Sequence, residues 1–274
     1  MGSDWGVAVS RLRTTFYILA RRNMWILPVG LLLLMWAVAP TVIHAKAYKL
    51  PTIGGVVRAT ATGVTDGVLY RATIASLGRL AIAFILGAVL GIIVGLAMAT
   101  SRVVMYVAEP VVAFFQAVAG VAWIPLAIVW FGFGTGPVLF VVGNAVFFIV
   151  VYNTVLGVRQ IPIVLISAAR TLGASRFRLL REVIVPGALV SVLTGLRGGL
   201  AFGWRALIAV EIIAASTGLG YITVSASANY QSALIIVAII EVGLLWLAMD
   251  RFLLRTIERR TIERWGLILK EQVR

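Results

Sequence analysis

SAARTLGASRFRLLREVIVP, from Ser167 to Pro186, is the stretch of this sequence that decides the fold. It is strongly basic, contains one glycine, ends on a proline and lies between two long apolar runs. A basic connection between two membrane spans is typical of the cytoplasmic side. The stretch therefore predicts a short helix through Ala168 to Leu180 that either docks on a partner or lies on anionic lipid headgroups.

The composition places this stretch in an integral membrane protein. Of the 274 residues, 61% are hydrophobic and only 12% are charged, and several windows exceed the roughly 18 apolar residues that cross the bilayer as a helix. We expect an all-α fold with about six transmembrane helices, at 24–44, 74–99, 107–131, 137–157, 188–214 and 232–254. The predicted domains are a cytoplasmic segment 1–23, a transmembrane domain 24–254 with a connecting loop 158–187 between spans 4 and 5, and a basic tail 255–274.

The distribution of the 24 basic residues predicts the orientation of these spans. If the N-terminus is cytoplasmic, seventeen lie in cytoplasmic segments and four lie outside, in the first connection. Both termini should therefore be inside. The net charge of +14 follows this pattern, so we expect membrane lipid and no nucleic acid as a partner. Part of 50–72 is a candidate for a helix along the interface.

The sequence contains no arrangement typical of catalysis. It has no Cys, its single His44 has no cluster of ligands that could complete a metal site, and no G-x-x-x-x-G-K-[ST] phosphate loop occurs. We therefore expect no catalytic residue, no metal site and no bound cofactor. Two other classes remain as alternatives: a channel that works without nucleotide, and an intramembrane enzyme, which would require clustered catalytic residues.

Polar and aromatic residues in the spans are candidates for the pore or a gate. Glu211 is the foremost, because an ionisable side chain in hydrocarbon normally faces the protein interior or water. Arg205 is six residues away, too far for simple helical pairing, so Glu211 needs a partner on another helix or subunit. A gate or interhelical role is weighed against direct substrate contact. The other candidates are Trp123, which could instead join an aromatic belt, Pro125, Asn144, which could instead bond another helix, and Trp204.

Glycines predict two further local features. Gly87, Gly91 and Gly95 repeat every four residues, the pattern that lets helices pack closely. The uncharged segment 216–231 is expected to re-enter the external mouth, with Gly218 and Gly220 turning its backbone.

The Ser167 to Pro186 stretch resembles the signature loop of inner-membrane permease subunits of binding-protein-dependent ABC importers. That signature reads EAA, three residues, G, nine residues, I, one residue, L, P. Ala168, Ala169, Gly173 and Pro186 match it, Val183 and Val185 are conservative replacements, and Ser167 replaces the Glu. The resemblance implies a coupling helix that contacts an ATPase, with candidate residues Ser167, Ala168, Ala169, Gly173, Ala174, Phe177 and Pro186.

Longer motifs resemble the branch of nitrate, taurine and alkanesulfonate permeases. They lie in the expected order at Leu50 to Val56, Ser76 to Ala99, Ala122 to Gly134 and Leu193 to Ile222. One departure is that Ala119 and Gly120 stand where the branch usually has prolines.

The resemblance implies a type I ABC importer permease of the bacterial inner membrane without catalysis of its own. It implies a homodimer around a central path, two ATP-binding cassette subunits that hold ATP and Mg²⁺, and a periplasmic or lipid-anchored binding protein. The expected substrate is a small anion such as a sulfonate, taurine or nitrate, with an unrelated organic nutrient as the alternative.

Overall fold

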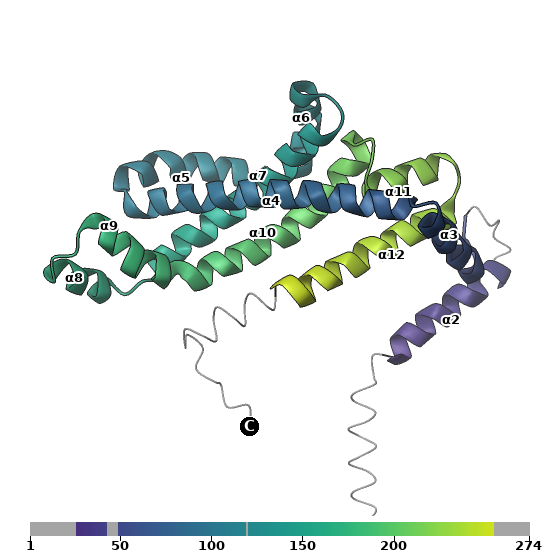
Figure 1. The fold of residues 1–274 in the computed structure, drawn as a ribbon, viewed down its shortest axis with the longest axis horizontal. Helices are drawn as coiled ribbons and strands as arrows, with labels where there is room; N and C mark the ends of the chain where they lie inside the picture. Colours follow the sequence, from purple (N-terminus) through teal and green to yellow (C-terminus); the bar gives the residue numbers. More distant parts are fainter. Residues whose placement is uncertain (1–25, 43–48, 119, 255–274) are drawn as a thin grey trace, which may run out of the picture.

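The computed structural model describes residues 26–42, 49–118 and 120–254, and within these ranges all regular structure is helical (Figure 1). The predicted segments 1–23 and 255–274, and His44, lie outside the described residues. The helices in chain order are α2 (Ile26–Val42), α3 (Ile53–Thr65), α4 (Val68–Thr100), α5 (Arg102–Ala117), η1 (Gly120–Trp123), α6 (Ile124–Phe131), α7 (Thr135–Arg159), α8 (Ile163–Thr171), α9 (Arg176–Leu179), η2 (Leu180–Ile184), α10 (Val185–Ala214), α11 (Leu219–Ala228), α12 (Ser232–Ala248) and η3 (Met249–Leu254).

The centre of the fold is α7, which packs between α4 and α10. Its Val142, Val146 and Val150 are completely buried. The glycines of α4 allow the close approach that their spacing predicts: a Cβ added at Gly87 would lie 2.6 Å from the Gly143 carbonyl oxygen, and one at Gly95 would lie 2.7 Å from Thr154 Cβ. The predicted packing role of these glycines is confirmed.

Among the described residues, four helices are long and apolar enough to cross a membrane. They are α4, α7, the continuous helix of α9, η2 and α10 over Arg176–Ala214, and α12 with its extension over Ser232–Phe252. Each corresponds to a predicted span. The 17-residue α2 lies within the predicted first span, whose ends fall outside the described residues.

The predicted third span, 107–131, is not one continuous helix. Its residues belong to α5 and to the pair η1 and α6, which meet at a bend of 93°. The break follows Ala117, because Val118 has an extended backbone and ends α5. Counted as one broken span, this pair brings the candidate spans of the described residues to five. The count of six stays a prediction.

The two ends of the helical bundle carry different elements. Figure 1 shows α8 and α9 at one end, and α3 and α11 at the opposite end. The helix α3 falls in the segment predicted as an interfacial helix, and Thr52 caps it by accepting a hydrogen bond from Gly55 N at 3.2 Å. The predicted external re-entrant segment contains the short apolar helix α11.

Candidate coupling surface and buried charge network

The connection between α7 and α10 forms an elbow of two short helices. Gly173, with φ +77°, follows the end of α8 in the left-handed conformation. Gly173 N donates to the Arg170 carbonyl at 2.9 Å, and Ala174 N donates to the Ala169 carbonyl at 3.0 Å. This pair of bonds is a Schellman motif. Ser175 then caps α9 by accepting a hydrogen bond from Arg178 N.

This elbow corrects the expectation of one helix from Ala168 to Leu180. The helix stops at Thr171 and restarts at Arg176 because Gly173 turns the backbone between them. A Cβ at Gly173 would meet no atom within 4 Å. Its glycine is therefore required here by backbone conformation, and not by close packing within this chain.

One side of the elbow is anchored and the other is open. Leu179, Ile184 and Ala188 are buried together with Val158 and Ile161, and Ala169 packs against this cluster. On the open side Leu172 is 87% exposed and Phe177 is 70% exposed. Of the other predicted coupling residues, Ser167, Ala168 and Gly173 are exposed, and Ala174 and Pro186 are half-buried.

The elbow joins α10 through a π-helical turn. In η2 the Val185 N–H reaches back five residues to the Leu180 carbonyl. Pro186 sits in the first turn of α10, where its missing N–H is tolerated. The elbow and the long span α10 are consequently joined through one continuous helix, so a displacement of the elbow can reach α10 directly.

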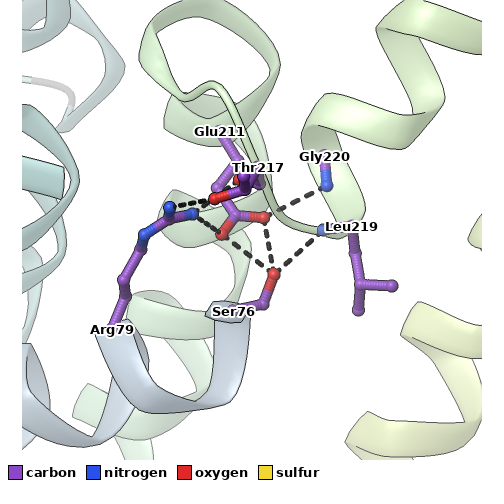
Figure 2. A network of polar contacts seen from close by, with 6 residues as sticks. All are labelled: Ser76, Arg79, Glu211, Thr217, Leu219 and Gly220. Carbon is purple, nitrogen blue, oxygen red and sulfur yellow. Dashed lines mark hydrogen bonds and ion pairs between the residues drawn. The ribbon is translucent and has the colours of Figure 1, made fainter. Parts of the chain in front are cut away.

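Glu211 on α10 is fully buried, and both of its carboxylate oxygens accept hydrogen bonds (Figure 2). Its Oε1 accepts a hydrogen bond from Arg79 Nη1 at 2.9 Å, and its Oε2 accepts one from Gly220 N at 3.1 Å. Ser76 Oγ lies 2.9 and 2.8 Å from the two oxygens, and the same hydroxyl accepts a hydrogen bond from Leu219 N. The partner that Glu211 requires is therefore Arg79, on α4.

Arg79 extends the network to the turn between α10 and α11. Its Nη1 donates to the Thr217 carbonyl at 2.6 Å, and its Nη2 donates to Thr217 Oγ1 at 2.5 Å. Gly218, with φ +116°, completes the turn, and a Cβ there would collide with the Glu211 carboxylate. The predicted turn at Gly218 is present. Gly220, in contrast, is helical, and it allows α11 to approach Glu211 closely.

This arrangement ties three helices together with a neutral ion pair. A buried pair is tolerated when its remaining hydrogen-bonding capacity is satisfied, as the contacts of Glu211 and Arg79 show. The carboxylate has no face left open toward a solute within this chain. The geometry gives Glu211 an interhelical structural position, and a gating role for it stays a prediction.

The other pore candidates do not form one cluster with Glu211. Trp123 is half-buried among aromatic rings, 5.4 Å from Phe115 and 6.4 Å from Phe140 between centroids. Its Nε1 is buried and has no hydrogen-bond partner in the described residues. Pro125 is exposed, Asn144 is half-buried and Trp204 is buried in the core. Their assignment to the pore stays a prediction.

The pairing of Arg79 with Glu211 is the feature that sequence reasoning missed. Arg79 lies within one predicted span and Glu211 within another. Opposite charges in two spans tend to pair with each other, and this signal could have identified the pair. Ser76, one helical turn before Arg79, adds a second polar group on the same face of α4. The described residues contain no group of three or more residues that could hold a metal ion.

Three relatives are similar to most of this chain. The taurine transport system permease protein TauC of Escherichia coli K12 is 36% identical over 77% of this chain and 75% of its own length. The putative aliphatic sulfonates transport permease protein SsuC of the same organism is 36% identical over 83% and 86%. The bicarbonate transport system permease protein CmpB of Synechococcus elongatus is 36% identical over 69% of each chain.

A solved structure shares the fold. A chain of the MetNI methionine ABC transporter in an inward-facing conformation superposes with a TM-score of 0.56, at 20% identity, over 70% of this chain and 97% of that one. The family described as "Binding-protein-dependent transport system inner membrane component" matches residues 87–262, a range that includes α7, the coupling elbow and the whole of α10. The chain belongs to this family of ABC importer permeases, as a membrane transport subunit and not a catalyst.

Proposed function

We propose that this chain forms, with a second copy of itself, the translocation path of an ATP-driven importer for a small oxyanion in the bacterial inner membrane. A periplasmic or lipid-anchored binding protein delivers the substrate, and both termini of the chain are cytoplasmic. The observation that carries the proposal is the exposed coupling elbow at one end of the bundle, inside the region that matches the permease family.

The energy source is supplied by another polypeptide. The sequence has no phosphate loop, so ATP and Mg²⁺ belong to two ATPase subunits that bind beneath the permease. Leu172 and Phe177 present apolar side chains on the predicted cytoplasmic surface, where a groove of an ATPase can bury them. Closure of the paired ATPases on ATP then moves the elbows and opens the path outward, and hydrolysis resets it.

The relatives and the charge balance of the Glu211 network support this substrate class. Taurine, aliphatic sulfonates and bicarbonate all carry an anionic oxygen group. A buried carboxylate would oppose such a solute. Here the charge of Glu211 is balanced by Arg79 at 2.9 Å, so it presents no such barrier.

The test is to isolate the tagged chain in mild detergent, identify the polypeptides that co-purify, and reconstitute the complex in liposomes. We expect a P-loop ATPase in the complex and ATP-dependent uptake of taurine, ethanesulfonate or bicarbonate once the binding protein is added. A chain that purifies alone and passes these solutes without ATP would identify a channel. ATP-driven uptake of an uncharged nutrient alone would refute the anion assignment.

A further inference from the structure

Three arginines lie at or within the predicted spans 74–99 and 188–214, and their environments differ. Arg79 is buried against Glu211, and Arg197 bonds Asp250 at 3.0 Å. Arg205, on α10, is exposed and has no carboxylate or hydrogen-bond acceptor among the described residues. Its one described contact is with the ring of Phe202, 5.5 Å from the guanidinium carbon to the ring centroid. Arg205 is therefore the arginine of this group whose charge no carboxylate of the described residues neutralises.

The depth of Arg205 makes an exposed charge there costly. It lies nine residues before the external end of α10 at Ala214, which is about 13 Å along a helix axis. The hydrocarbon core is about 30 Å thick, so Arg205 lies near its middle if the predicted span 188–214 crosses it. Charged side chains at this depth face a water-filled cavity or a partner group, and they commonly mark substrate pathways.

The face of α10 that carries Arg205 is separate from the buried charge network. Thr194, Gly198 and Ile212 are spaced four and seven residues apart around Arg205, so they share its face of the helix. Thr194 and Ile212 are exposed, and Gly198 offers no side chain. Glu211 lies six residues further along, about 120° around the helix from Arg205, on the packed side that faces α4 and α11. The helix α10 thus carries Glu211, paired in the packed interior, and Arg205, without a carboxylate partner among the described residues, on an exposed face.

We infer that Arg205 lines the translocation path and binds the anionic oxygen group of the transported solute, a sulfonate or a comparable oxyanion. A guanidinium suits this role because it stays charged and donates two parallel hydrogen bonds to such a group. The Phe202 ring adds a cation–π contact, with its centroid 5.5 Å from the guanidinium carbon. The inference rests on the proposed function, since it assigns the substrate-contacting residue of the same path.

Water access to position 205 can be tested directly because the chain contains no cysteine. An Arg205→Cys variant in native membranes should react with a charged, membrane-impermeant methanethiosulfonate. A matched Leu90→Cys variant, on the exposed and uniformly apolar face of α4, should react at least tenfold more slowly. If both variants react equally slowly with the reagent, position 205 faces lipid, and the inference is overturned.

Anion binding is tested by uptake of ethanesulfonate into liposomes that hold the complete complex. Arg205→Gln should lower uptake at subsaturating solute at least tenfold, while Arg205→Lys retains part of it. Arg197→Gln is the control from the same helix and should keep uptake within about twofold of the natural chain.

The outcomes separate the two claims. If the natural complex transports ethanesulfonate and Arg205→Gln transports it equally well, the inference fails and the proposed function stands. If Arg205→Gln prevents two permease copies from associating, Arg205 pairs with a carboxylate of the second copy, and the inference is also overturned. If the natural complex transports none of taurine, ethanesulfonate and bicarbonate, the proposed function itself fails.

Discussion

The elbow and the Glu211 network lie in different parts of the fold and differ in what they expose. One presents apolar side chains at the surface, and the other buries a charged side chain. The elbow exposes the apolar side chains of Leu172 and Phe177, which lie close together in sequence on its open side. The network buries Glu211 completely and satisfies both of its oxygens within the chain. We therefore propose that a partner completes the first region, whereas the second is complete in a single copy.

This difference predicts how the two regions respond to substitution. Changes in the network should destabilise the fold, because each removes a partner of a buried charge. Changes on the open side of the elbow should leave the fold intact and remove an interaction with another polypeptide. Substitutions that lower stability should thus lie in the network, and substitutions that weaken coupling to an ATPase should lie in the elbow.

The largest effect on stability is expected from Glu211→Ala. It leaves the Arg79 guanidinium buried without its charge partner, at a cost of about 3–5 kcal/mol. The measurement is the thermal midpoint and yield of monodisperse protein in detergent. The double variant Arg79→Met with Glu211→Leu removes both charges and should recover much of the loss. A double variant no more stable than Glu211→Ala would contradict the ion-pair account.

A smaller loss is expected from Gly218→Ala. The residue has φ +116°, and the added Cβ would collide with the Glu211 carboxylate, so we expect destabilisation of at least about 1–3 kcal/mol. Gly243→Ala is the matched control, because it lies within α12 and its Cβ meets nothing within 4 Å. Both thermal midpoints are read in the same detergent. Equal midpoints for the two variants would show that the turn is not held as described.

Gly173→Ala should affect the elbow and little else. The left-handed backbone costs an alanine roughly 1–2 kcal/mol, but its Cβ meets no atom. We expect a thermal midpoint within about 2 °C of the natural chain, because the strain can relax by local distortion of the elbow. The ATPase activity that depends on the permease should fall. Gly173→Asn, which tolerates this conformation, should retain more of that activity, and the reverse order would contradict the Schellman assignment.

Much of this fold could be predicted from local sequence. The long apolar runs mark α4, α7, α10 and α12, and the glycine spacing of α4 indicates its close packing on α7. The bend between α5 and α6 could not be predicted in this way. Hydropathy stays high across 107–131, and the break depends on the extended backbone of Val118.

The candidate sites show the same limit. The elbow is encoded in consecutive residues, and its motif predicts a coupling surface there, although Gly173 divides the expected helix in two. The network joins residues 132 positions apart, Arg79 and Glu211, and no local period relates them. Sequence reasoning established that Glu211 needs a distant partner, but only the packing of α4 on α10 identifies it.

The most direct test of the central claim, that the elbow is the ATPase-docking surface of an importer permease, is the retention of the ATPase by purified Phe177 variants. Phe177 is 70% exposed, so Phe177→Asp should leave the thermal midpoint nearly unchanged and abolish co-purification of the ATPase. The matched Phe177→Leu variant keeps an apolar side chain and should retain most of the ATPase. Full retention by Phe177→Asp, with ATP-driven uptake intact, would contradict the account.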